Sequence, residues 1–291
     1  MGLLALQPLW RTGLDHRPPP DPRRRSRRLI AMAWETLLYE PAGRVGTITI
    51  NRPDQLNALN STVFREMSEL LAEIAVDPAI RVIVLKGAGN KAFVAGADIK
   101  EMVDMSRREA ETRSWTGMRL YDQMRRMPQP LVASIQGYAL GGGMLIAMAC
   151  DIRVASTAAS FGYPEIKLGI FPGTGGTVLI DRLIGPATAR AICLLGDRFS
   201  AERAFQLGLV NRIAEPDDLE KETAEVVETL ANYSPVAMRE LKTVLNASLE
   251  MDFATAREVE LDAYGRCFDS EDRREGTRAF VEKRKPDFKG R

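Results

Sequence analysis

The sequence predicts an α/β fold with a mainly parallel sheet, followed by a helical C-terminal region. From residue 34 to about residue 215, short apolar segments alternate with amphipathic ones, which is typical of parallel strands joined by helices. After about Pro216 the helical pattern is almost continuous. We therefore expect an N-terminal extension over 1–31, an α/β core over 32–215 and a helical region over 216–291.

Each segment of the expected core has its own local signal. The expected strands cover 45–50, 80–89, 131–140 and 152–164. The first helix is expected to take Ser61 as its N-cap, because apolar residues follow at helical spacing as far as Ile74. A second helix is expected over 107–127, where Pro128 and Pro130 would end it.

The composition excludes several classes of protein and chemistry. No apolar run reaches the roughly 18 residues that span a bilayer, so we expect a soluble protein. Its three cysteines, Cys150, Cys193 and Cys267, are few and widely spaced, which fits a reducing compartment. The only histidine is His16, so Ser-His-Asp hydrolysis and most zinc or iron sites are not expected. Acid–base chemistry then falls to carboxylates, lysine, tyrosine or water held by the backbone.

The N-terminal extension differs from the rest of the chain. Residues 1–31 contain seven arginines and two aspartates, a net charge of +5, whereas the remainder carries −4. Because this tail is also rich in proline and lacks periodicity, we expect it to be disordered. It could precede a true translation start at Met32, direct the protein to mitochondria, or bind nucleic acid. We favour the first explanation, since the prolines interrupt any amphipathic helix, and we expect a cytoplasmic protein.

The stretch ALGGGMLIAMACD, residues 139–151, combines a glycine turn with a helix that is apolar on every face. Gly141, Gly142 and Gly143 lie where the first turn of this helix would begin. Amide groups there have no partner within the helix, and the helix dipole adds partial positive charge. This backbone could hold an oxyanion. Alternatively, the glycines could only allow tight packing of strand on helix.

Two further segments could complete such a site. FVAGADIKEM, residues 93–102, is a second glycine turn after a buried strand and could supply another amide to the same oxygen. In FGYPEIKLGIFPGTGG, residues 161–176, Glu165 follows a proline among aromatic and aliphatic neighbours. Such surroundings could raise the pKa of its carboxyl and suit it to acid–base catalysis. The plainer interpretation is a glutamate that starts a helix or forms a salt bridge.

Taken together, these motifs resemble the crotonase superfamily, the enoyl-CoA hydratase/isomerase family. The resemblance extends from about residue 34 to residue 291 and also includes NRPDQLNALN, SPVAMRELK and FVEKRKPDFKGR. It implies a spiral of β-β-α units with a helical C-terminal region that forms homotrimers or hexamers. It also implies an enzyme of fatty-acid β-oxidation that acts on acyl-CoA thioesters, with coenzyme A as part of the substrate and without a separate cofactor or a metal.

The resemblance assigns roles to individual positions. The amides of Ala97 and Gly142 would bind the thioester oxygen, and Glu165 would transfer protons. The substrate contacts it implies are Gln55, Leu56, Asn57, Ala58, Ala95, Asp98, Ile99, Lys100, Gly141, Leu145, Pro164, Gly173, Phe280 and Lys283. In this family, residues matching Phe280 and Lys283 usually reach the coenzyme A of a neighbouring subunit.

Leu145 departs from the family pattern, because typical hydratases carry a second glutamate at this position. Glu165 alone could support hydration if backbone near Gly173, or Tyr138 or Tyr163, held the water. It could instead shift a double bond, as in a Δ3,Δ2-enoyl-CoA isomerase, and decarboxylation or thioester hydrolysis also remain open. We favour hydration, because PEIKLGIFPGTGG looks most like a hydratase.

Other functional classes have weaker support. GAGNKA, residues 87–92, fits a dinucleotide-binding fingerprint, but no helix is expected to open at its glycines. Leu145 and the basic extension also fit a non-catalytic, RNA-binding member of the family, although the extension has no aromatic residue among its arginines. The methionines around Trp115 could border an acyl pocket or pack a helix onto the core. We expect an enzyme without a nucleic-acid partner.

Overall fold

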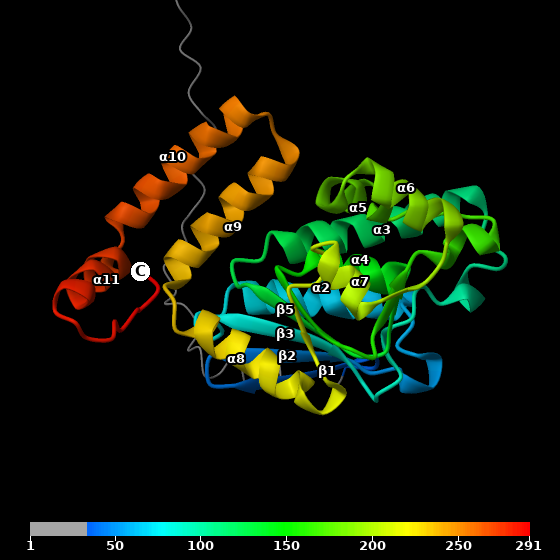
Figure 1. Cartoon of the computed structure of the whole chain (residues 1–291), viewed down its shortest axis with the longest axis horizontal. Coiled ribbons are helices and arrows are strands. Elements are labelled where there is room, and N and C mark those ends of the chain that lie inside the picture. Colours follow the sequence, from blue (N-terminus) through cyan, green and yellow to red (C-terminus); the bar gives the residue numbers. More distant parts are fainter. Residues whose placement is uncertain (1–33) are drawn as a thin grey trace, which may run out of the picture.

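Two sheets of mainly parallel strands form the centre of the computed structural model, which describes residues 34–291 (Figure 1). The larger sheet has the order β1-β2-β3-β5-β7-β10 and the smaller one β4-β6-β8-β9. The strands of the larger sheet are β1 (Leu37–Ala42), β2 (Val45–Ile50), β3 (Val82–Gly87), β5 (Leu131–Ile135), β7 (Ile152–Ser156) and β10 (Arg212–Ala214). Those of the smaller sheet are β4 (Ala92–Val94), β6 (Tyr138–Leu140), β8 (Ser160–Gly162) and β9 (Phe199–Ser200). Within residues 34–291, only β1–β2 and β8–β9 pair antiparallel.

The helices cover and connect these sheets. They are α2 (Ser61–Ala75), α3 (Arg107–Arg125), α4 (Gly142–Ala149), α5 (Gly176–Ile184), α6 (Pro186–Leu195), α7 (Ala201–Gln206), α8 (Leu219–Ala231), α9 (Pro235–Glu250), α10 (Phe253–Asp269) and α11 (Glu271–Val281). Short 3-10 helices are η1 (Pro53–Gln55), η2 (Ile99–Glu101), η3 (Pro164–Leu168) and η4 (Pro216–Asp218).

The chain winds as a spiral of repeating units. Three times a strand of the large sheet is followed by a strand of the small sheet and then by a helix: β3-β4-α3, β5-β6-α4 and β7-β8-α5. Parallel pairing brings the corresponding strands of successive units side by side in each sheet. This arrangement confirms the expected crotonase-type spiral of β-β-α units.

Three local predictions were wrong in detail. Residues 131–140 form two strands in different sheets, because the chain turns at Gly137, whose φ is +58° and where a Cβ would lie 2.0 Å from the Lys91 carbonyl oxygen. Residues 152–164 divide in the same way into β7 and β8. The N-cap of α2 is Asn60 rather than Ser61, since the Asn60 side chain accepts a hydrogen bond from the Val63 amide at 2.9 Å.

The turn over 87–92 does not have the geometry of a dinucleotide site. It leads directly into β4, so no helix opens at its glycines. A Cβ at Gly87 would lie 2.2 Å from the Phe93 carbonyl oxygen, so this glycine is needed for close packing of the backbone. The structure therefore gives no support to a nicotinamide-dependent enzyme.

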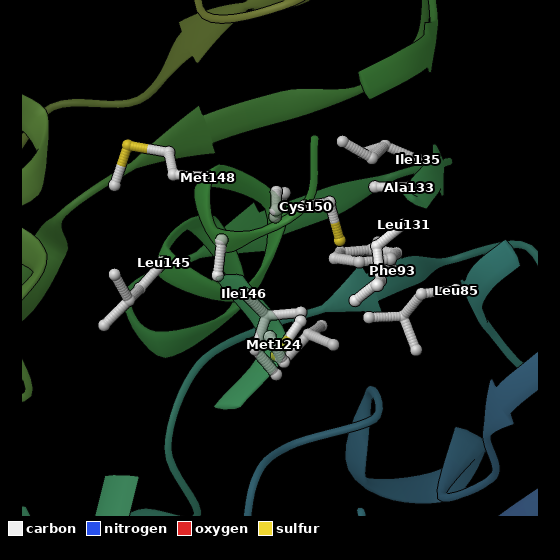
Figure 2. Close-up of a cluster of buried hydrophobic side chains, with 14 of the residues drawn as sticks. Leu85, Phe93, Met124, Leu131, Ala133, Ile135, Leu145, Ile146, Met148 and Cys150 are labelled. Atoms are coloured by element: carbon white, nitrogen blue, oxygen red, sulfur yellow. The ribbon is translucent and has the colours of Figure 1, made fainter. Parts of the chain in front are cut away.

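The short helix α4 is buried and packs very closely on β4. A Cβ at Gly143 would lie 2.0 Å from the Val94 carbonyl oxygen and 2.7 Å from the Val94 Cβ. Leu145 and Ile146 both belong to the apolar cluster that contains Phe93 and Leu131, and Leu145 lies at the side of this cluster away from Phe93 (Figure 2). The absence of a side chain at Gly143 therefore fixes the distance between the first turn of α4 and the segment after β4.

The last helices have two different environments. Helix α8 packs on the large sheet, where Val226 and Val227 join a small apolar cluster with Val82 and Val132. Helices α9 to α11, here called the helical arm, extend beyond the sheets, and α9 and α10 run side by side (Figure 1). These helices lie within the C-terminal region proposed from the sequence.

Ion pairs tie the helical arm to the core, and the one at Lys242 is the more buried. The Lys242 Nζ on α9 donates to the Asp151 Oδ2 at 2.6 Å and to the Gln129 carbonyl oxygen at 2.9 Å. The same Asp151 oxygen accepts the amide of Leu131, the first residue of β5, at 2.7 Å. The carboxylate that follows α4 thus joins the large sheet to the arm.

Other expectations concern residues that the structure describes only in part. The predicted N-terminal extension, with His16 and Met32, lies outside the described residues. Within residues 34–291 no helix is long and apolar enough to cross a membrane. All three cysteines are free thiols, as expected from their spacing.

We expect Gly143→Ala to lower the free energy of unfolding by about 1–3 kcal/mol, because the new methyl group meets backbone that cannot move aside. Lys221→Ala on α8 is the control for a change to alanine on a helix: Lys221 is exposed, so the free energy of unfolding should change by less than about 0.5 kcal/mol. Denaturant titration at one protein concentration measures both. Equal stability of Gly143→Ala and the unaltered protein would contradict the close contact.

Candidate active site

A cavity of about 280 Å³ lies at the N-terminal end of α4 and is lined mainly by apolar side chains. Segments from α2, the turn after β4, α3, α4 and the stretch after β8 meet there. Nine predicted site residues line it: Ala95, Ala97, Ile99, Gly141, Gly142, Leu145, Pro164, Glu165 and Gly173. The structure thus brings the two glycine turns and the carboxylate together.

Two backbone amides of this cavity have no hydrogen-bond acceptor in the described chain. Leu59 pairs with the segment at Ala97: its amide donates to the Gly96 carbonyl oxygen, and its carbonyl oxygen accepts the Asp98 amide. The Ala97 amide lies between these two bonds and has no acceptor. Gly142 is the first residue of α4, and its amide has no acceptor one turn earlier. Both residues are half-buried and line the cavity, so these two amides are available to a ligand oxygen.

Glu165 lies against the backbone at the start of α4. A Cβ at Gly141 would lie 2.6 Å from the Glu165 Oε1, so only glycine leaves room for this carboxylate. Its Oε2 is buried and has no hydrogen-bond partner. Burial raises the pKa of Glu165 to about 6, although a backbone hydrogen bond acts in the opposite direction. The carboxyl can therefore exchange a proton near neutral pH.

The side chain at position 145 brings hydrocarbon, rather than a second carboxylate, to the cavity. Leu145 is 2 % exposed and lines the cavity from the first turns of α4. The only charged side chains in the lining within residues 34–291 are Glu165 and Arg113. Any second polar group in the reaction must therefore come from backbone, hydroxyl groups or Arg113.

The two tyrosines singled out from the sequence lie in different places. Tyr163 lines the cavity, and its hydroxyl oxygen is buried without a hydrogen-bond partner. Burial raises the pKa of this phenol well above its usual value, so it stays protonated and can donate a hydrogen bond. Tyr138 is not among the lining residues, and the Arg198 guanidinium lies 5.4 Å from its ring centroid.

The remaining predicted contacts do not line the cavity of this single chain. They are Gln55, Leu56, Asn57, Ala58, Asp98, Lys100, Phe280 and Lys283. Phe280 is 85 % exposed on α11, which lies on the helical arm away from α4 (Figure 1). Among residues 34–291, no group of three or more His, Cys, Asp or Glu side chains is placed to hold a metal ion.

Asn57 instead organises the protein's own backbone. It is fully buried, and its Nδ2 donates to the carbonyl oxygens of Ala88 at 2.9 Å and Ala92 at 2.8 Å. Its Oδ1 accepts the Arg52 amide at 3.0 Å. The side chain of Asn57 therefore supports β4 and the turn that carries Ala97, and it has no free polar atom for a ligand.

The structure adds lining residues that the sequence interpretation did not single out, above all Arg113 and Tyr121 on α3. Their signal is present in the sequence, because residues 113, 117 and 121 are four apart and share one face of the helix. Gly117 and Tyr121 on that face are buried. An arginine on an otherwise buried helical face indicates a functional role, but only the fold shows which cavity it lines.

Comparisons with known proteins agree with this geometry. The family model for enoyl-CoA hydratase/isomerase matches residues 40–291. The chain is 40% identical over 261 residues to the short-chain-enoyl-CoA hydratase of Clostridium acetobutylicum, covering 89% of this chain and 100% of that protein. It is 38% identical over 257 residues to the crotonyl-CoA hydratase of Syntrophomonas wolfei, covering 88% and 99%.

The solved structures show the same fold. The crystal structure of an enoyl-CoA hydratase from Bacillus anthracis matches with a TM-score of 0.85 at 36% identity, covering 88% of this chain and 100% of that one. A structure of an enoyl-CoA hydratase subunit from Geobacillus kaustophilus also has a TM-score of 0.85, at 38% identity, covering 89% and 100%. The chain therefore belongs to the enoyl-CoA hydratase/isomerase family.

Proposed function

We propose that this protein catalyses the reversible addition of water to 2-enoyl-CoA thioesters. The observation that carries the proposal is the position of Glu165, whose carboxylate lies against Gly141 in the cavity that holds the free amides of Ala97 and Gly142. Relatives named short-chain-enoyl-CoA hydratase and crotonyl-CoA hydratase, which match nearly the whole chain, support the same activity.

The two free amides would stabilise the charge that develops on the substrate. The thioester oxygen would accept hydrogen bonds from the amides of Ala97 and Gly142, and the N-terminal end of α4 adds partial positive charge. These donors draw electrons from the double bond, which makes the β-carbon electrophilic and stabilises the enolate that follows. Loss of one donor of this kind typically costs about 3–4 kcal/mol of transition-state stabilisation.

Glu165 would transfer the proton in both steps. Its carboxylate takes a proton from water while the water oxygen bonds to the β-carbon, which leaves an enolate and a neutral Glu165. The carboxyl then gives this proton to the α-carbon and returns to its ionised form. The Tyr163 hydroxyl, which lines the cavity without a partner, is one group that could hold the water where Leu145 cannot.

Isomerisation is the second candidate activity, and Leu145 is the observation that favours it. With hydrocarbon beside the reacting carbons, Glu165 could remove an α-proton from a 3-enoyl thioester and return it to the γ-carbon without adding water. The same two amides would stabilise the intermediate enolate.

We further propose a homotrimer or hexamer in the cytoplasm, built through the helical arm. Large apolar side chains are exposed on α9 to α11: Leu241, Leu245, Phe253, Leu261, Tyr264, Phe268, Phe280 and Val281. Exposed apolar surface of this extent is typical of subunit interfaces. In such an assembly, Phe280 and Lys283 could reach the coenzyme A bound to a neighbouring subunit.

The full chain should be offered crotonyl-CoA and a cis-3-enoyl-CoA separately in deuterated water, with products identified by mass spectrometry. Addition of one water molecule to crotonyl-CoA supports hydration by Glu165. Migration of the double bond of the 3-enoyl thioester, with crotonyl-CoA left unhydrated, would replace hydratase by isomerase. No reaction with either thioester would contradict both activities.

We expect Glu165→Gln to lower kcat by roughly 10²–10⁴-fold, because the amide cannot accept and return the proton. KM should stay near that of the unaltered protein, since size and position are retained. Glu228→Gln on α8 is the control, because Glu228 is exposed and lies outside the cavity. Steady-state kinetics on crotonyl-CoA measure both, and full activity of Glu165→Gln would exclude its role in proton transfer.

The activity should depend on the ionised form of Glu165. Because burial raises the pKa of this group to about 6, we expect kcat/KM to be constant above that pH and to fall about tenfold per pH unit below it. The direction follows from the carboxylate acting as the base in the first step. A profile that is flat down to pH 4.5 in a protein that remains folded would contradict the assignment.

We expect Leu145→Glu to raise the rate of hydration relative to isomerisation, because it supplies a second carboxylate to position water. Leu145→Gln is the matched control, since it adds polarity without a base. Both variants bury a polar group, so circular dichroism must first show that each is folded. A folded Leu145→Glu protein with an unchanged ratio of the two rates would count against this explanation.

A further inference from the structure

Arg113 brings a positive charge to the cavity, and within residues 34–291 it forms no ion pair with a carboxylate. Its Nη2 donates to the Leu59 carbonyl oxygen at 3.1 Å, and its guanidinium lies 5.3 Å from the ring centroid of Phe64. Its Nε is buried and has no hydrogen-bond acceptor. The guanidinium is thus held in place by a backbone oxygen and an aromatic ring, and one of its donors remains unused.

The nearest acidic residues have other partners. The Asp98 Oδ2 accepts a hydrogen bond from the Arg52 Nη2 at 2.9 Å. The Glu101 Oε2 accepts from the amide and hydroxyl of Ser61 at 2.9 Å and 3.0 Å. Within residues 34–291, no carboxylate forms an ion pair with Arg113. Burial lowers the pKa of Arg113, with only partial compensation from Tyr121, Glu101 and Asp98, yet a guanidinium remains charged in proteins.

An acyl chain made only of hydrocarbon would exclude solvent from the guanidinium and leave its charge without a partner. An acyl group with an anionic end would neutralise this charge and accept a hydrogen bond from the Nη1, which has no acceptor in the described part of the chain. A planar guanidinium is also the side chain best shaped to bind a carboxylate.

Arg113 occupies a wall rather than the floor of the cavity. Together with Phe64 and Met105 it also lines a neighbouring groove that opens between α2 and the start of α3. Glu165, Gly141 and Gly142 do not border that groove. A substrate whose thioester lies at the free amides could therefore direct the far end of its acyl group toward Arg113.

We propose that Arg113 binds a carboxylate carried by the acyl group, so that the preferred substrates are 2-enoyl-CoA thioesters of dicarboxylic acids. This inference rests on the proposed function, because it places an acyl-CoA thioester in the cavity. It adds a specificity-determining residue that acts on the acyl group and takes no part in proton transfer. Phosphate oxygens of the coenzyme A moiety are the other anions that Arg113 could bind, and the experiment separates them.

The experiment compares kcat/KM for glutaconyl-CoA and for 5-methyl-2-hexenoyl-CoA, in which an isopropyl group replaces the carboxylate. The unaltered protein is expected to prefer glutaconyl-CoA. Arg113→Met should lower the ratio of the two values by about ten- to hundredfold, the usual effect of losing a hydrogen bond between charged groups. Arg113→Lys should retain part of the ratio, because it keeps the charge and loses the fork of donors.

Arg119→Met is the control for loss of an arginine from the same helix, since Arg119 is exposed and lies outside the cavity. The ratio should not change in this variant. A purely structural role of Arg113 would lower both kcat/KM values alike and leave the ratio constant, which would overturn the proposal. A loss that occurs with crotonyl-CoA but disappears with crotonyl-pantetheine would assign Arg113 to a coenzyme A phosphate and would also overturn it.

A binding measurement keeps this test independent of turnover. Calorimetry with the saturated analogues glutaryl-CoA and 5-methylhexanoyl-CoA should give the same preference and the same dependence on Arg113. If glutaryl-CoA binds more tightly but no enoyl thioester reacts, the proposed function fails and the recognition of the carboxylate stands. If the enoyl thioesters react without any preference for the charged acyl group, the hydratase stands and this inference fails.

Discussion

The site depends on the direct contact between the backbone of α4 and that of β4. At Gly143 the Val94 carbonyl oxygen occupies the place of a Cβ, and at Gly137 the Lys91 carbonyl oxygen does the same. These contacts hold the two glycine turns at a distance that no larger residue allows. The free amides of Ala97 and Gly142 share one cavity only because these two positions have no side chain.

The cavity contains few charges, and each has a separate environment. Burial raises the pKa of Glu165 to about 6 beside Gly141, and Arg113 rests on Phe64 at 5.3 Å. Leu145 adds hydrocarbon to the lining rather than a second carboxylate. In the proposed reaction, Glu165 would transfer the proton and Arg113 would recognise the acyl group, so the two tasks would fall to different side chains of one cavity.

The local sequence correctly predicts features that depend on neighbouring residues. It does not predict features that depend on contacts with distant segments of the chain. The buried helix after Gly141 and the shifted pKa of Glu165 follow from their own surroundings, and both appear in the structure. The single strand expected over 131–140 is wrong. The chain turns at Gly137, where the carbonyl oxygen of the distant Lys91 leaves no room for a Cβ, and nothing in the local sequence shows this contact. Arg113 was not predicted as a site residue, because only the position of α3 relative to β4 places its side chain at the cavity.

The Lys242–Asp151 pair links the helical arm to the end of α4, although the main apolar core contains no residue of α9 to α11. If the arm moved away, the Asp151 carboxylate would lose its cation while it still faces the Leu131 amide. Loss of one partner from a buried ion pair typically costs about 3–5 kcal/mol, because the remaining charge is left uncompensated. The arm and α4 should therefore open together in native-state hydrogen exchange, so that the arm and the candidate active site share one cooperative unit.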